Sequence, residues 1–347
     1  NRQAAPLSGG RYHEWVWNSD NSWQQSEHAT LYFGANARRL NDEGYINRVT
    51  TRLDQFNNAS TLRGAQVAQE LRGWKGRLTV RAAARTSRNT IGSLGLALTA
   101  RTRLSLSAGT ASQFPDPGQI RATPLLPERA NHTQISLEQR LDSRTRLRFE
   151  LWRRADRDLL TRPLFDPRLL NGRIYTGNPV APWTNTQRLH ARGAQVLLQR
   201  RSANGLTGWV SYAYTAAPGA DFEQRHTINA FSSYRLRPTV NISGRWSYGS
   251  GFPIRAYVAG SAAQYRLSAT RNDLHLSAYH RLDLRANKTY IRKGWQMTLY
   301  AELVNVYNHA NYRFNEVTSV DARTGIVRLG IDKMFPVLPS AGLAIEF

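Results

Sequence analysis

Cysteine is absent from the 347-residue chain, and its absence excludes several kinds of site. Without thiols the chain can form no disulfide framework, thiol nucleophile, thiolate zinc site or iron–sulfur cluster. Long apolar runs are also missing, since no stretch reaches the ~18 consecutive apolar residues that a membrane-spanning helix requires. Aromatic residues make up 10% of the chain and are spread along it, which does not fit a disordered protein. We therefore expect a folded chain without a transmembrane helix.

Lysine is scarce, although the chain is strongly basic. Four of the 47 Lys+Arg residues are lysines, and with 24 Asp+Glu residues the formal net charge is +23. Clustered cations would indicate a nucleic-acid partner. The arginines are instead scattered singly among apolar residues. We therefore expect no nucleic acid, and favour a basic surface or lumen that meets anionic lipid or solute.

Motifs for catalysis and metal binding are equally sparse. None of the eight histidines has His-Glu-x-x-His spacing, and His275 and His280 would lie on opposite faces of a strand. There is no Gly-x-Ser-x-Gly elbow and no phosphate-binding glycine loop. We predict neither an enzyme nor a metal or cofactor site.

Hydrophobic residues recur with a period of two, which is typical of β-strands. In the clearest segment, Trp295 to Leu303, the odd-numbered residues are apolar and the even-numbered ones mostly polar. Similar alternation occurs in 77–84, 206–214 and 240–248. Each of these segments therefore predicts a strand with one apolar and one polar face.

These patterns predict about sixteen strands. They lie near residues 11–18, 28–39, 44–54, 60–71, 75–86, 91–100, 102–110, 130–141, 144–158, 187–200, 205–216, 225–236, 238–249, 276–290, 294–307 and 340–347.

The connections between the predicted strands alternate in length. Short turns are predicted at 142–143, 202–205, 236–238 and 290–294, and long connections at 111–129, 159–186, 250–275 and 308–339. Outer-membrane β-barrels have this parity, with short periplasmic turns at one end and long extracellular loops at the other. The pattern favours an all-β, antiparallel transmembrane β-barrel in the bacterial outer membrane.

A soluble β-sandwich or propeller would also show a period of two, because the period does not tell lipid from a protein core. Three features favour the membrane. Loops of about 20 or more residues are unusual in a compact soluble domain. Aromatic residues such as Tyr212, Trp246 and Trp295 lie toward strand ends, as in the girdles of a barrel. The chain also ends on an alternating strand that closes with Phe347.

The chain after about residue 100 resembles a known family. The tail Leu343-Ala-Ile-Glu-Phe347 resembles the terminal strand that outer-membrane barrels present to their assembly machinery. Segments 279–290 and 299–308, which contain Leu-Asp-Leu and Asn-Val-Tyr-Asn, resemble the last strands of TonB-dependent receptors. Segments 109–141 and 221–251 resemble earlier strands of the same barrels, so the resemblance covers roughly residues 100–347.

The resemblance implies energised uptake of a scarce solute. In this family extracellular loops bind an iron–siderophore complex, cobalamin, another metal chelate or an oligosaccharide, and the TonB complex moves a plug held in the lumen. A complete receptor has a TonB box and a plug ahead of about 22 strands, and neither precedes Asn1. We therefore expect residues 1–347 to be the C-terminal part of such a barrel, without the plug that contacts TonB, and the natural N-terminus to lie upstream.

Three alternatives remain open at this point. A passive porin of about sixteen strands is the first, because 347 residues suffice for such a barrel. A soluble β-rich binding or adhesion protein is the second. An outer-membrane hydrolase with a Ser/His site on its wall is the weakest.

Candidate functional residues form three groups. Charged residues that alternate with apolar neighbours are expected to face the lumen, where they keep the interior solvated or dock a plug: Arg148, Glu150, Arg245, Asp283, Arg285 and Glu302. Residues of the long connections are expected to contact a solute or lipopolysaccharide: Tyr175, Trp183, Phe252, Arg255, Tyr257 and Tyr265. Leu343, Ile345 and Phe347 are expected to form the signal for the barrel assembly machinery. Outer-membrane lipid is the remaining expected partner.

Overall fold

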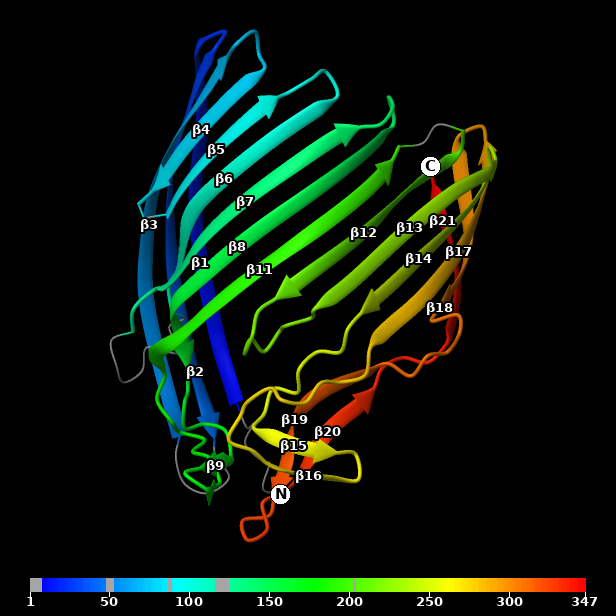
Figure 1. Ribbon diagram of the computed structural model, residues 1–347. Coiled ribbons are helices and arrows are strands. Elements are labelled where there is room, and N and C mark those ends of the chain that lie inside the picture. Colours follow the sequence, from blue (N-terminus) through cyan, green and yellow to red (C-terminus); the bar gives the residue numbers. More distant parts are fainter. Residues whose placement is uncertain (1–7, 48–52, 87–88, 116–124, 202–203) are drawn as a thin grey trace.

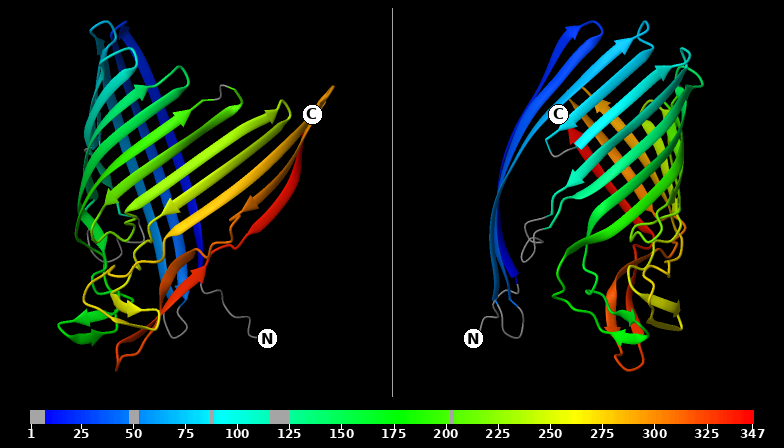
Figure 2. Two further views of the ribbon diagram at one scale, coloured as in Figure 1. Left: turned by 45° about the vertical axis from the view of Figure 1, so that its right-hand side comes forward. Right: turned by 60° about the vertical axis from the view of Figure 1, so that its left-hand side comes forward.

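Fifteen strands form one curved antiparallel sheet in which each strand pairs with its neighbours in chain order (Figure 1). The computed structural model describes all residues except 1–7, 48–52, 87–88, 116–124 and 202–203. The sheet is strongly curved, as two further views show from the sides (Figure 2). Among the described residues, the two outer strands of the sheet are not paired with each other. The described part also contains no helix long and apolar enough to cross a membrane.

The strands of this main sheet are β1 (Ser8–Ser26), β2 (Ala29–Asn47), β3 (Leu53–Gly73), β4 (Leu78–Arg85), β5 (Asn89–Ala97), β6 (Thr102–Gln113), β7 (Glu128–Arg140), β8 (Thr145–Thr161), β11 (Thr184–Arg200), β12 (Leu206–Ala216), β13 (His226–Arg237), β14 (Val240–Gly249), β17 (Tyr279–Arg292), β18 (Trp295–Val304) and β21 (Leu338–Glu346). Two small sheets lie in the long loops. One pairs β9 (Arg168–Leu170) with β10 (Arg173–Tyr175), and the other contains β15 (Val258–Ser261), β16 (Gln264–Leu267), β19 (Tyr312–Val320) and β20 (Ile326–Lys333).

The strand count agrees with the prediction of about sixteen, but the first part of the chain is divided differently. Three strands are predicted at 28–39, 44–54 and 60–71, whereas the structure has only β2 and β3 there, of 19 and 21 residues. The polar run Asn41-Asp-Glu-Gly44 has low strand propensity and resembles a turn. In the structure these residues remain paired with β1, so β2 continues through them. Backbone pairing between the strands therefore outweighs the low strand propensity of these four residues. Residues 48–52 of the predicted strand lie outside the described residues.

The alternation of short and long connections is confirmed for most of the sheet. Turns of two to four residues join β1 to β2, β5 to β6, β7 to β8 and β17 to β18 at one end of the sheet. Long loops follow β8, β14 and β18 at the opposite end. We call these the turn end and the loop end. The predicted loops 250–275 and 308–339 differ in one respect, because they contain the short strands β15, β16, β19 and β20.

The pairing register places apolar residues of one strand opposite apolar residues of the next, and polar residues opposite polar ones. Leu284 lies opposite Leu303, and Leu299 opposite Leu343, so one face of neighbouring strands is apolar. Arg285 lies opposite Glu302 on the other face. We call these the apolar face and the polar face. Large apolar side chains of the apolar face are 38–60% exposed at Leu299, Leu284 and Leu343, which is the reverse of a soluble sheet packed on a core.

Aromatic side chains border the apolar face at both ends. Toward the loop end lie Tyr212, Tyr214, Trp246 and Tyr248, in the register of neighbouring strands, and Tyr234, Tyr290 and Trp295 lie toward the turn end. From His280 to Tyr290 on β17 the strand rises about 33 Å, or about 25 Å across a membrane at a tilt of about 40°. That height matches the hydrocarbon-facing band of an outer-membrane barrel, so the apolar face meets lipid and the polar face the lumen.

The first prediction concerns this assignment of faces. Leu299→Arg places a charge on the apolar face, and it should lower the free energy of unfolding in bilayers by about 2 to 4 kcal/mol if the position lies near the midplane. Thr298→Arg should be mild, because Thr298 lies on the polar face and exchanges a hydrogen bond with Thr289 at 3.1 Å. Reversible urea unfolding in lipid vesicles measures both. A larger loss for Thr298→Arg would mean that the two faces have been interchanged.

The second prediction concerns the C-terminal strand. Ile345 and Leu343 lie opposite Met297 and Leu299 on the apolar face, and Phe347 follows the strand fully exposed. We propose these three residues as the assembly signal. Deletion of Phe347 should reduce the amount of heat-modifiable, folded protein in outer membranes more than Glu346→Gln does. Equal assembly of the two variants would argue against the signal.

Candidate ligand-binding site

Three of the expected lumen residues meet on the polar face of β17 and β18. Arg285 and Glu302 form an ion pair of 3.6 Å, and the Arg285 Nε donates to Asn287 at 2.9 Å. Asp283 pairs with Arg281 at 2.8 Å and accepts a hydrogen bond from a backbone N–H at 3.0 Å. These charges are therefore largely neutralised within the wall itself.

Arg148 and Glu150 form a separate pair on β8, at 2.8 Å. Gln134 of β7 donates a further hydrogen bond to Glu150. Four strands of the sheet stand between β8 and β17, so the structure does not bring this pair together with the group on β17 and β18.

Arg245 on β14 differs from the other five residues, because it has no counter-charge among the described residues. It lies directly opposite Asp283 in the register, but Asp283 is held by Arg281. The Arg245 side chain is exposed on the polar face. Its guanidinium is thus free to meet an anion from outside the wall.

A cavity of about 630 Å³ opens where the polar face meets the loops, and we call it the mouth cavity. Arg245 of β14 and Arg281 of β17 line this cavity from the polar face of the sheet. The loop between β14 and β17, residues 250–278, contributes Phe252 and Arg255, and β19 contributes Tyr312. The cavity therefore combines cations with aromatic rings, a lining suited to an anionic ligand with aromatic or planar groups.

A second hollow of about 700 Å³ adjoins the mouth cavity on the loop side. The two share Asp221, Arg255 and Phe314 in their lining. No carboxylate of the described chain lies within ion-pair distance of Arg255, although its charge acts on Asp221 from farther away. This exposed side chain therefore presents a guanidinium without a direct ion pair to both hollows. Arg245 and Arg255 are the two arginines of the mouth that lack an ion pair within the described residues.

Arg271 joins three different loops at this mouth. It forms an ion pair with Asp166 of the 162–183 loop and a bidentate contact with Asp221 of the 217–225 loop, with N–O distances of 3.0 and 2.9 Å. Asn272 donates a further hydrogen bond to Asp221 at 2.9 Å. We call Arg271, Asp166 and Asp221 the loop clamp.

Two of the three charges of the loop clamp, those of Asp221 and Arg271, are stabilised. Burial alone would raise the pKa of Asp221, but hydrogen bonds from Arg271 and Asn272 and the charges of Arg271 and Arg255 outweigh it and lower that pKa. Burial alone would lower the pKa of Arg271, but Asp221 and Asp166 raise it. Because the pKa of Asp221 is depressed, its contribution to stability is present above the ordinary aspartate pKa and is lost only as the pH falls through the lower folded-state value.

The same loops share a hydrophobic core. Ile254, Val258, Leu267 and Val327 are at most 5% exposed and come from the 250–278 and 305–337 loops. Leu169 and Ile174 of the 162–183 loop pack against them. These three loops thus pack into one body.

The structure divides the six loop residues expected to contact a ligand. Phe252 and Arg255 line the mouth cavity. The other four make contacts within the protein. Tyr257 accepts a hydrogen bond from Arg168 of another loop at 3.0 Å, and Tyr265 packs on the hydrophobic core. Within the 162–183 loop, Tyr175 donates to the backbone carbonyl of Leu164 at 3.0 Å, and the Trp183 ring centroid lies 5.6 Å from the Arg162 guanidinium.

Sequence reasoning missed several residues of the mouth. Arg281 could have been found, because it alternates with Asp283 and Arg285 on the same strand. Asp166, Asp221 and Arg271 carry no local signal, since Asp166 and Arg271 are 105 positions apart and meet only in the folded loops. No group of three or more His, Asp or Glu side chains in the described ranges is placed to hold a metal ion.

Comparison with known proteins places this architecture in a family. The model of the TonB-dependent receptor-like β-barrel matches residues 2–306. A comparison with curated protein sequences returns no match.

Solved structures with a similar fold are receptors and transporters. The ferric enterobactin receptor PfeA of Pseudomonas aeruginosa, in a mutant form, has a TM-score of 0.65 and 13% identity, over 97% of this chain and 54% of its own. The FrpB iron transporter of Neisseria meningitidis has a TM-score of 0.63 and 16% identity, over 93% and 56%. BauA, the ferric preacinetobactin receptor of Acinetobacter baumannii, has a TM-score of 0.59 and 12% identity, over 97% and 55%.

At these identities the likeness shows the fold, and this chain spans about half the length of each of these proteins. The expected all-β outer-membrane barrel is confirmed. The family match, which covers most of the chain, and the lipid-facing sheet together show that this chain belongs to the β-barrel family of the TonB-dependent receptors, bacterial outer-membrane proteins that are not enzymes.

Proposed function

We propose that this barrel belongs to a receptor for an anionic metal chelate of the ferric-siderophore class, taken up by TonB-energised transport. The observation that carries the proposal is the mouth cavity, in which Arg245 and Arg255 face the ligand space without a carboxylate partner. An anion would satisfy both guanidinium groups through charge-assisted hydrogen bonds.

The chemistry of the mouth favours a chelate over the other solutes that the family resemblance allows. An uncharged oligosaccharide would leave Arg245 and Arg255 without an anion, whereas a negatively charged catecholate complex offers both charge and planar rings. Phe252 and Tyr312 supply aromatic surface for such rings. The names of the structurally similar PfeA and BauA, both receptors of ferric siderophores, support the same class.

The remaining partners follow from the same proposal. A plug segment outside residues 1–347 would occupy the lumen and contact TonB, and the paired charges of β17 and β18 would face it. Outer-membrane lipid and lipopolysaccharide would surround the apolar face, and the assembly machinery would insert the barrel. A passive porin is the less favoured alternative, since the family match is to receptors of the TonB-dependent type.

The third prediction tests the ligand class. Arg245→Gln with Arg255→Gln should weaken binding of a ferric catecholate complex to the purified intact receptor by about tenfold or more, because each guanidinium loses a charge-assisted contact. Isothermal titration measures the Kd. The matched control is Arg323→Gln, at an exposed loop position outside the mouth cavity, which should bind within about twofold of the wild type.

Uptake of radioactive iron by cells distinguishes transport from passage through a pore. We expect uptake of the same complex to stop when TonB is deleted. Uptake that continues without TonB would favour the porin. Equal binding by the double variant and the control would exclude the mouth cavity as the site for this ligand class.

The fourth prediction concerns the loop clamp. Arg271→Gln leaves Asp166 and Asp221 without their shared cation, and we expect the clamp to lose about 1 to 2 kcal/mol. Hydrogen exchange at backbone amides of loops 162–183 and 217–225 should then become about tenfold faster. Amides of β14 and β17 should be unchanged.

Arg323→Gln again provides the control, because it removes the same charge from the same end of the barrel. If both variants exchange alike, or if exchange rises equally in the strands, Arg271 does not act as a clamp between loops.

A further inference from the structure

Four arginines lie on the apolar face of the sheet at its loop end. Arg129 of β7 is directly opposite Arg157 of β8, and Arg153 of β8 is directly opposite Arg192 of β11. Arg153, Arg157 and Arg192 are exposed and Arg129 is half-buried. We call them the outer arginines.

The outer arginines begin where the apolar band ends. On β8, Arg153 follows Leu147, Phe149 and Leu151 at the same parity. On β11, Ala194 lies opposite Tyr214, one of the aromatic residues that border the apolar face. Arg192 is the next residue of the same face toward the loop end. The four charges therefore lie at the level of the lipid headgroups of the outer leaflet, where a charge on this face is tolerated.

Nothing in the described chain neutralises these charges. None of the four has an ion pair with a described carboxylate, and like charges directly opposite each other on neighbouring strands destabilise a sheet. The nearest acidic residues of these strands have the opposite parity and other partners: Asp156 holds Arg154 at 2.7 Å, and Glu128 accepts from the Leu160 N–H at 2.7 Å. The two cross-strand arginine pairs therefore have no counter-ion within the described chain.

A hollow of about 450 Å³ lies beside the first pair. Arg129 and Arg157 line it together with Asn131, and Phe114 and Pro127 provide apolar contacts. The hollow therefore offers two charges and a side-chain amide to a single anionic group.

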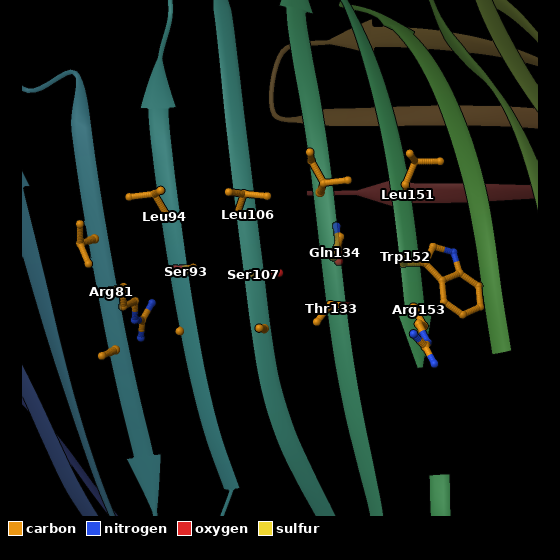
Figure 3. A pocket seen from close by; sticks show the side chains of 15 residues that line it. Arg81, Ser93, Leu94, Leu106, Ser107, Thr133, Gln134, Leu151, Trp152 and Arg153 are labelled. Atoms are coloured by element: carbon orange, nitrogen blue, oxygen red, sulfur yellow. The ribbon is translucent and has the colours of Figure 1, made fainter. Parts of the chain in front are cut away.

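An apolar groove of about 820 Å³ continues from Arg153 toward the middle of the membrane. One wall is a row of large side chains on adjacent strands, in which Leu94, Leu106 and Leu151 align (Figure 3). The other wall is the next row of apolar-face residues on the same strands, from Ala82 to Arg153. The row between these two walls forms the floor of the groove and consists of Arg81, Ser93, Ser107, Gln134 and Trp152. Because apolar-face residues form both walls, the groove opens on the apolar face, toward lipid.

We propose that the outer arginines and this groove bind one phosphorylated, acylated lipid of the outer leaflet, with its phosphates on the arginine pairs and an acyl chain in the groove. The two pairs are four residues apart on β8, or about 13 Å, so two phosphate groups on one headgroup can be bound together. Each guanidinium can make a bidentate contact with a phosphate group. This inference rests on the membrane location and is independent of the solute that the mouth cavity binds.

The fifth prediction tests this site in the intact protein extracted from outer membranes in detergent. The probe is lipid A that carries two phosphates, titrated by native mass spectrometry. Arg129→Gln with Arg157→Gln, and Arg153→Gln with Arg192→Gln, should each raise the Kd about tenfold or more. The control Arg292→Gln with Lys293→Gln removes the same charge from exposed positions at the turn end and should stay within about twofold.

Three results would overturn the proposal. Equal affinity of both double variants and the control would exclude the outer arginines. Equal binding of fully dephosphorylated lipid A would exclude a phosphate site, and equal saturation by inorganic phosphate at the same concentrations would exclude a lipid as the occupant. Heat-modifiable mobility establishes that each variant is folded, and the two double variants test the site independently if one fails to assemble.

Discussion

The backbone of a lipid-exposed wall must satisfy all its hydrogen bonds within the protein, and the rest of this structure depends on that constraint. A continuous antiparallel ladder meets it for strands, and the ladder also fixes the register of every strand against the next. Once the register is fixed, the parity of a residue decides its face. Leu284 and Leu303 therefore lie together on the apolar face, while Arg285 and Glu302 form an ion pair on the polar face.

The same parity rule separates two populations of arginine. Arg245 and Arg281 have polar-face parity and reach the mouth cavity, whereas Arg153 and Arg192 have apolar-face parity and reach the headgroup level. These two groups of arginines thus present positive charge on two different surfaces. The hydrophobic core around Val258 lies in the loops, because the strands have turned their own apolar side chains outward.

The period of two predicted the strands from the sequence, whereas the barrel was predicted from the connection lengths, the aromatic positions and the C-terminal strand. Segment 295–303 predicts β18 and its faces directly, and most strands after residue 60 follow within a few residues. Prediction was wrong where ladder pairing overrides composition, as at Asn41 to Gly44 within β2. It found Phe252 and Arg255 at the mouth but could not find the loop clamp, because the contact between Asp166 and Arg271 depends on how two distant loops pack.

The central claim is that alternate residues of each strand face lipid and lumen. Because the chain has no cysteine, a single cysteine at each position of β17 from Arg281 to Ala286 can carry a spin label without background. Accessibility to oxygen, which concentrates in lipid, and to a water-soluble nickel complex should then be measured in bilayers. The account predicts high oxygen accessibility at the even-numbered positions and high nickel accessibility at the odd-numbered ones. Accessibility without alternation, or with the opposite parity, would contradict it.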